Sequence, residues 1–229
     1  MSVAERIAKI ESRIENTCLR SGRKRDEITL MAVTKFRPVD AVEQAWKAGL
    51  RIFGESRVQE ASQKFGSLTV DRAGMQLHLI GNLQSNKAKT AVSLFDCIQS
   101  VDRLSLIPDL AKYATGLASP LPLLFEFRTG ESSKNGFDDP DDLFRAADLV
   151  LGSPSLKICG LMTMAPFTND DPAVRSAFRR LAKLRQDLMQ RFPGNENWEY
   201  LSMGMSGDFE IAIEEGSTML RIGTAIFGG

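Results

Sequence analysis

Lys35 is the residue of this sequence that is best placed for covalent chemistry. It follows directly on the apolar run Met31-Ala32-Val33-Thr34, at the expected end of a strand. A lysine held against an apolar wall has its charged form disfavoured, so its pKa falls and its amine becomes a nucleophile. The usual product with a carbonyl compound is a Schiff base. A solvated lysine at a strand end is the common alternative, and Lys35 taken alone does not decide between them.

Two later segments have the composition of phosphate-binding loops. They are Ser202-Met203-Gly204-Met205-Ser206-Gly207-Asp208 and Arg221-Ile222-Gly223-Thr224. Small residues let backbone N–H groups approach an anion, and the start of a following helix adds positive potential. The candidate phosphate ligands are Ser206, Gly207, Gly223 and Thr224. Helix capping by Ser206 and Asp208 is the alternative, but capping does not explain the glycines of the first segment.

Arg221 and His78 are polar residues inside apolar strand patterns. Arg221 stands between Leu220 and Ile222, so strand alternation places its guanidinium on the opposite face from them. A buried guanidinium needs a partner, which is either a structural carboxylate or an acceptor on a ligand. His78 lies between two leucines, and we interpret it as a satisfied core histidine rather than a catalytic base. The sequence therefore assigns no catalytic residue.

Strand-like and helical patterns alternate along the chain. An amphipathic helix comes first, with apolar residues from Val3 to Cys18 at steps of three and four, and Ser21-Gly22 ends it. Eight strand-like runs follow, separated by helices, at residues 28–33, 51–53, 77–80, 96–98, 121–127, 156–162, 200–201 and 219–222. Strict alternation of strands and helices implies a parallel sheet with crossover helices.

Eight such units in 229 residues predict an α/β fold, a (β/α)8 TIM-type barrel in a single domain with an extra N-terminal helix. We expect the helix within residues 1–21 and the barrel within residues 28–229. A doubly wound open sheet is the alternative, but no G-x-G-x-x-G follows the first strand. Barrels often bind phosphate between the loops after strands seven and eight, which are the two loops with phosphate-binding composition.

The composition excludes several functional classes. Lys and Arg number 29, Asp and Glu also number 29, and aromatic residues make up 7%, which argues against nucleic-acid and membrane-surface binding. One histidine and three widely spaced cysteines argue against a metal site. We expect these cysteines to be buried free thiols of a reducing compartment. A charged N-terminus and the absence of a long apolar run predict a cytoplasmic protein.

Several segments together resemble the pyridoxal phosphate homeostasis protein family, whose members are single-domain barrels similar to the N-terminal domain of bacterial alanine racemases. The resemblance runs from near the first strand to the end of the chain. It rests on the segments Ala32-Val33-Thr34-Lys35, Phe53-Gly54-Glu55, Val58-Gln59-Glu60, His78-Leu79-Ile80-Gly81-Asn82-Leu83-Gln84-Ser85-Asn86-Lys87, Gly160-Leu161-Met162-Thr163-Met164, Leu201-Ser202-Met203-Gly204-Met205-Ser206 and Arg221-Ile222-Gly223-Thr224-Ala225-Ile226-Phe227-Gly228.

The resemblance implies pyridoxal phosphate (PLP) as the cofactor and gives roles to the candidate residues. Lys35 is then the Schiff-base lysine, and Arg221 lies near the pyridine nitrogen. The phosphate rests on the four loop residues named above, and the protein is a monomer. The family usually has Asn after Phe-Gly-Glu, where this chain has Ser56, so this position offers no side-chain amide for the contact expected there.

Three functional hypotheses follow. The first is a non-catalytic carrier for PLP homeostasis or delivery, with apo PLP-dependent enzymes as recipients. The second is an amino-acid racemase-like enzyme, and the third is a cofactor-free lyase in which Lys35 attacks a phosphorylated sugar. An arginine beside the pyridine nitrogen weakens the ring as an electron sink, and related racemases add a tyrosine base. The chain has only Tyr113 and Tyr200, both away from the expected mouth, which favours the carrier.

Overall fold

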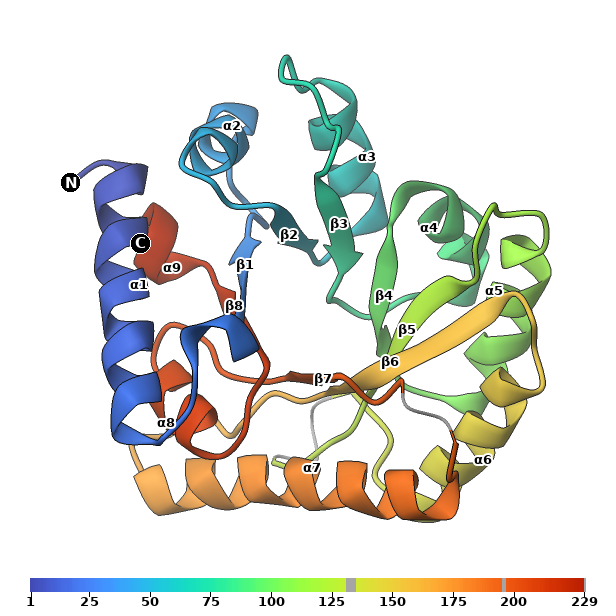
Figure 1. The fold of residues 1–229 in the computed structure, drawn as a ribbon. Coiled ribbons are helices and arrows are strands. Elements are labelled where there is room, and N and C mark those ends of the chain that lie inside the picture. The colour runs from blue at the N-terminus through green and yellow to red at the C-terminus, as the bar shows by residue number, and fades with distance from the viewer. Residues whose placement is uncertain (131–134, 195–196, 229) are drawn as a thin grey trace.

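A computed structural model of the chain shows a closed barrel of eight parallel strands (Figure 1). The structure describes residues 1–130, 135–194 and 197–228. The strands follow one another around the barrel in sequence order, and β1 closes it by pairing with β8. Their bounds are β1 (Thr29–Val33), β2 (Ile52–Glu55), β3 (Gln76–Leu79), β4 (Cys97–Val101), β5 (Leu121–Glu126), β6 (Leu156–Met162), β7 (Tyr200–Ser202) and β8 (Met219–Ile222).

Helices surround the barrel on the outside (Figure 1). The α-helices in the described part of the chain are α1 (Val3–Arg20), α2 (Val39–Lys47), α3 (Val58–Gly66), α4 (Ala88–Leu94), α5 (Ile107–Ala114), α6 (Pro140–Leu151), α7 (Asp171–Arg191), α8 (Phe209–Glu214) and α9 (Thr224–Phe227). Short 3-10 helices are η1 (Arg25–Glu27), η2 (Ser85–Lys87) and η3 (Leu104–Leu106).

The apolar core lies in two layers. The larger layer joins strand and helix residues and includes Leu123 and Phe125 of β5. Leu124 lies between them in the sequence and belongs instead to a small separate cluster with Cys97 and Cys159. Successive side chains face opposite sides of a strand, so this second cluster lies inside the barrel.

β6 is irregular where it runs between β5 and β7. Its pairing with β5 shifts register between Leu123 and Leu124, next to Gly160. Gly160 has a φ of +147°, and a Cβ there would lie 2.0 Å from the carbonyl oxygen of Tyr200. Only glycine accepts both the backbone angle and the close approach of β7.

The N-terminal helix packs against the outside of the barrel. Ser2 and Glu5 form a capping box at its start. Its buried face carries Ile7, Ile10 and Ile14, and it contacts α8, α9 and α2. In Figure 1, α1 and α9 lie side by side. The first helix therefore supports the last elements of the barrel.

The structure confirms the predicted (β/α)8 barrel with its preceding helix. The strand predicted over 121–127 is one residue shorter in the structure. β5 ends at Glu126, and Phe127 pairs only through an isolated bridge with Phe137. The prediction of buried free thiols is confirmed for Cys18, Cys97 and Cys159.

Two further surveys concern the described residues only. Among them, no helix is long and apolar enough to cross a membrane. The same residues contain no group of three His, Cys, Asp or Glu side chains arranged to hold a metal ion.

Candidate functional site

Lys35 lies at the C-terminal end of β1, two residues beyond Val33, where the strand ends. Thr34 is fully buried, whereas the Lys35 side chain is exposed. The apolar wall expected from the sequence therefore does not enclose Lys35. Phe36, the next residue, has a φ of +61°, a left-handed conformation that is disfavoured in every residue with a side chain.

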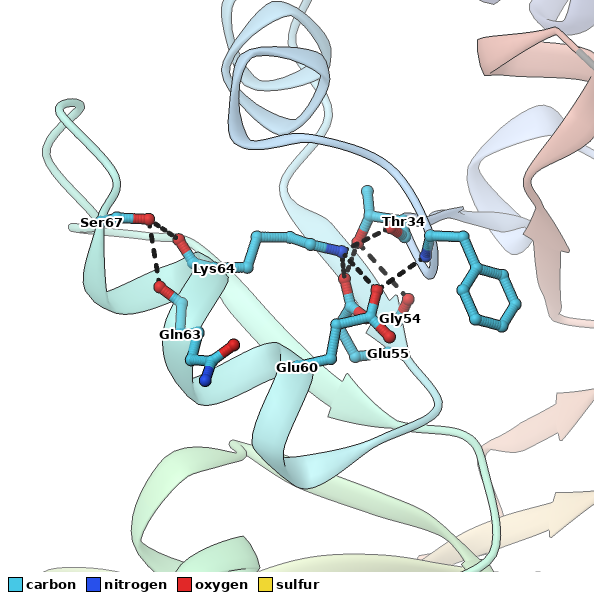
Figure 2. Close-up of polar contacts among 8 residues, drawn as sticks. Thr34, Gly54, Glu55, Glu60, Gln63, Lys64 and Ser67 are labelled. Carbon is cyan, nitrogen blue, oxygen red and sulfur yellow. Dashed lines mark hydrogen bonds and ion pairs between the residues drawn. The ribbon is translucent and has the colours of Figure 1, made fainter.

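A buried ion pair lies directly against this turn (Figure 2). Lys64 of α3 and Glu55 at the end of β2 form it, with Nζ 2.7 Å from Oε1 and side chains only 7% and 0% exposed. Lys64 Nζ also donates to the carbonyl oxygen of Thr34 at 2.7 Å. The Thr34 hydroxyl donates to Glu55 Oε1 at 2.7 Å. The residue before Lys35 is thus bonded through both its backbone and its side chain.

Glu60, one helical turn before Lys64, extends the ion pair to the other side of Lys35. Its Oε1 lies 3.2 Å from Lys64 Nζ and accepts a hydrogen bond from the Phe36 N–H at 2.8 Å. We call Glu55, Glu60 and Lys64 the Lys64 cluster.

Burial affects the two carboxyl groups of the Lys64 cluster differently. Desolvation raises the pKa of Glu55 above its ordinary value, and the bonds from Lys64 and Thr34 offset this only in part. Desolvation acts on Glu60 in the same sense, but hydrogen bonds from Phe36 and Lys64 outweigh it and hold the pKa of Glu60 below its ordinary value. Glu60 is therefore a carboxylate at neutral pH.

The loops after β7 and β8 meet at one end of the barrel. The backbone N–H of Ala225 donates to Ser206 Oγ at 3.2 Å, which ties the first loop to the start of α9. Asp208 is the N-cap residue of α8, and its Oδ1 accepts from the Met205 N–H at 2.5 Å. The helix cap considered for Ser206 is therefore wrong, because α8 starts two residues later than that role requires.

The loop after β8 also borders the strand that leads to Lys35. A Cβ at Gly223 would lie 3.2 Å from the carbonyl oxygen of Val33. Gly207 and Thr224 are exposed and Gly223 is half-buried. The structure thus brings Lys35 and all four loop residues to the same end of the barrel.

Arg221 is buried inside the barrel, as strand alternation predicted, and is 4% exposed. Its Nη1 donates to the carbonyl oxygen and the Oγ of Ser202 at 2.6 and 2.8 Å, and its Nη2 donates to the carbonyl oxygen of Thr163 at 2.7 Å. Within the described residues, no carboxylate is hydrogen-bonded to it. Burial lowers the pKa of Arg221 to about 10, against the opposing charges of Glu126 and Asp208, so the guanidinium stays protonated at neutral pH.

A chain of hydrogen bonds continues from Arg221 across the barrel. The Ser202 hydroxyl donates to Gln99 Oε1 at 2.7 Å, and Gln99 Nε2 donates to His78 Nδ1 at 2.8 Å. His78 Nε2 then donates to Gln76 Oε1 at 3.3 Å. Burial lowers the pKa of His78 to about 4. The ring is neutral with both nitrogens bonded, as expected for a satisfied core histidine.

Glu126 is a polar residue of the barrel interior that the sequence analysis missed. It ends β5, is 3% exposed, and shares the inward face of the strand with Leu124. Burial raises its pKa to about 7, the charge of Asp102 adds to this, and the charge of Arg221 opposes it. Alternation from Leu124 was the signal that could have placed it inside.

A cavity of about 480 Å³ opens beside Lys35. The loops after β1, β2 and β3 line it, and Arg57 and Lys87 contribute two further basic side chains. Ser56, which stands where the resemblance leads one to expect Asn, is also in its wall. Ser56 therefore borders the space next to the candidate lysine.

Comparison with known proteins shows the family of this chain. The family model described as "Alanine racemase, N-terminal domain" matches residues 8–229. The pyridoxal phosphate homeostasis proteins of Vibrio cholerae and Aquifex aeolicus are 40% and 36% identical to this chain. The alignments cover 99% and 100% of this chain and 96% and 98% of those proteins. The chain belongs to the pyridoxal phosphate homeostasis protein family.

Solved structures extend the family relationship to three dimensions. PipY of Synechococcus elongatus with PLP bound is 36% identical to this chain, with a TM-score of 0.85. The superposition covers 99% of this chain and 100% of PipY. PipY without PLP gives a TM-score of 0.87. The alanine racemase from E. faecalis gives a TM-score of 0.71 at 16% identity, and the chain covers 59% of it. That more distant likeness is one of fold alone.

Proposed function

We propose that this chain binds PLP at the C-terminal end of its barrel. The residues that we assign to the cofactor are Lys35, Ser206, Gly207, Arg221, Gly223 and Thr224. The observation that carries the proposal is the closure of the barrel between β1 and β8, which puts the Lys35 turn beside the loops after β7 and β8. An amine, two hydroxyls, two glycines and a buried guanidinium share this end, and such a donor set fits an aldehyde that carries a phosphate.

Each group has its own task in this proposal. The Lys35 amine would hold the aldehyde carbon as a Schiff base, with the aldehyde oxygen leaving as water, and the loop hydroxyls and N–H groups would bind the phosphate. PLP supplies a conjugated ring that acts as an electron sink. Arg221, which is protonated at neutral pH, would lie near the pyridine nitrogen. Because a guanidinium does not give up its proton, that nitrogen would stay unprotonated and the sink would be weaker.

The biological role that we propose is PLP homeostasis or delivery without robust catalysis. Tyr113 lies in the outer helix α5, and Tyr200 lies at the start of β7, away from the end that carries Lys35. His78 is neutral and bonded at both nitrogens. Few of the described residues are therefore suited to moving protons at the mouth. In this proposal the protein is a cytoplasmic monomer that passes PLP to apo PLP-dependent enzymes.

Glu126 supports a second candidate, a racemase-like enzyme. Its buried carboxyl has a pKa of about 7 and interacts with the charge of Arg221. A group with this pKa can accept and release a proton near neutral pH, which is what a general acid or base requires.

A spectroscopic experiment tests the attachment site. We expect protein loaded with PLP to show a visible absorption band, which borohydride bleaches while fixing a PLP mass adduct on Lys35. Lys35→Ala is expected to lose the band, whereas Lys9→Ala, which removes an exposed lysine of α1, keeps it. An unchanged band in Lys35→Ala would overturn the assignment. A borohydride adduct with a phosphorylated sugar, but none with PLP, would favour the lyase.

Incubation with L- and D-alanine in deuterated water then separates the carrier from the racemase-like enzyme. The PLP-loaded carrier is expected to exchange the α-proton no faster than free PLP does. Exchange at enzyme-like rates that Glu126→Gln abolishes would contradict the carrier and identify Glu126 as the proton-transferring group.

A further inference from the structure

We propose that the Lys64 cluster positions Lys35 for its reaction with PLP. This inference rests on the proposed attachment of PLP to Lys35. The cluster bonds to both neighbours of that lysine. Lys64 donates to the carbonyl oxygen of Thr34 (Figure 2), and Glu60 accepts from the N–H of Phe36. The peptide groups on either side of Lys35 are thereby held, while its own side chain stays exposed.

The turn needs this support because its backbone is strained. The φ of +61° at Phe36 is unfavourable for an L side chain, and such strain persists only where the surroundings enforce it. The Phe36 ring is 69% exposed, so burial of the ring does little to enforce it. The Arg37 N–H closes the turn by donating to the carbonyl oxygen of Thr34 at 3.0 Å, and Arg57 lies over the Phe36 ring. The hydrogen bond from the Phe36 N–H to Glu60 at 2.8 Å adds a backbone contact from a different element of the fold.

A lysine is uncommon at a buried helix position if its only role is packing, and Lys64 occupies such a buried position. An ammonium on the buried face of a helix is stabilising only when its donors are all satisfied, and an apolar side chain commonly serves packing as well or better. Its three N–H groups have three acceptors, namely Thr34, Glu55 and Glu60. Two of these acceptors belong to or support the Lys35 turn. The Thr34 carbonyl oxygen is a backbone atom of the turn, and Glu60 accepts a hydrogen bond from the Phe36 N–H of the turn.

The test compares variants at Glu60, which is half-buried and whose replacement leaves the Lys64–Glu55 pair in place. Glu60→Ala removes the acceptor for the Phe36 N–H and is expected to raise the apparent dissociation constant for PLP about tenfold, with slower growth of the visible band. Glu60→Gln keeps a carbonyl oxygen at this place and is expected to stay within about threefold of the unmodified protein. Lys64→Met is expected to resemble Glu60→Ala.

A distant ion-pair variant provides the matched control. Arg175→Met removes the bonds of Arg175 to Glu214 and Glu215 at the end of α8, far from the Lys35 turn in sequence, while Arg179 keeps its own bond to Glu215. We expect it to lower the melting temperature while leaving PLP binding unchanged. Binding is measured for all variants at a temperature where circular dichroism shows each one fully folded, so loss of fold is not counted as loss of binding.

The outcomes separate this inference from the proposed function. If Glu60→Ala and Lys64→Met bind PLP as tightly and as fast as the unmodified protein, the positioning role is wrong, although PLP attachment to Lys35 stands. If Glu60→Gln loses as much binding as Glu60→Ala, the acceptor is not what matters and the inference is equally wrong. A visible band that survives in Lys35→Ala overturns the proposed function itself.

Discussion

Polar side chains occupy the interior of the barrel at positions where parallel barrels usually carry branched apolar residues. Arg221, Ser202, Gln99 and His78 donate hydrogen bonds in one direction, and the chain ends on Gln76. Each side chain therefore has a fixed orientation. A second proton on His78 would sit on Nδ1, where it would meet the N–H of Gln99, so two donors would face each other. The charged ring would then be buried without an acceptor for that proton.

The stability of the protein should depend on pH through His78. Its pKa is about 4 in the folded state and near 6.5 in an unfolded chain. The neutral ring thus contributes stability above about pH 6.5, which is lost as the pH falls toward 4. We expect the loss to be about 3 kcal/mol relative to His78→Gln. Urea unfolding of the unmodified protein and of His78→Gln at pH 7.5 and pH 4 measures this loss. An equal loss of unfolding free energy in the two proteins would contradict the expectation.

From the sequence, a site residue could be predicted where its type was informative by itself, and the assignment of the cofactor to these residues stays a prediction. Lys35 after an apolar run, and hydroxyls with glycines in two loops, indicate their chemistry from sequence, and the resemblance supplied PLP. The Lys64 cluster could not be found in this way. Its partners are backbone atoms of Thr34 and Phe36, and an amino-acid sequence does not show which carbonyl or N–H a distant side chain will meet.

At the scale of elements, the bulge in β6 depends on one glycine. Gly160→Ala would place a Cβ 2.0 Å from the Tyr200 carbonyl oxygen and impose a strained φ. We expect a loss of about 3 kcal/mol or more in the free energy of unfolding. Gly152→Ala is the control: it has an ordinary φ of −76° and a nearest contact of 3.4 Å. Thermal unfolding that shows equal stability for the two variants would exclude this account.

The order of elements was predictable because each strand is a short apolar run between helices, and only a closed or doubly wound parallel sheet fits eight such units. The element ends were less predictable. The start of α8 after Asp208, rather than after Ser206, is set by a hydrogen bond to Met205 and by the tie of Ser206 to Ala225. Both are contacts of the folded loops, which local sequence preferences do not contain.

At the scale of the whole molecule, the first helix, α1, packs against the last two helices, α8 and α9. Arg13 of α1 pairs with Glu210 of α8 at 3.0 Å, and Arg6 lies against the turn at Gly228 after α9. The apolar side of α1 is buried at the same place. Residues from the two ends of the chain thus support the loops that we assign to the phosphate.

We expect loss of packing under α1 to weaken the whole fold. Ile14 is fully buried, and Ile14→Ala removes three carbon atoms from this layer, which should cost about 3 kcal/mol of unfolding free energy. Glu15→Ala changes the exposed next residue of the same helix and should cost under about 0.5 kcal/mol. Denaturant unfolding of the two variants measures the difference, and a similar midpoint for both would contradict the expectation that packing under α1 stabilises the fold.

The hydrogen-bond chain inside the barrel also gives the molecule a natural spectroscopic reporter. The protein has a single histidine, so its imidazole N–H resonance in a proton NMR spectrum needs no assignment against others. The ring is 4% exposed and its N–H is bonded to Gln76, which slows exchange of the proton with water. Because the ring is linked through Gln99 and Ser202 to Arg221, the resonance should shift when a ligand arrives at the guanidinium, without any label in the protein.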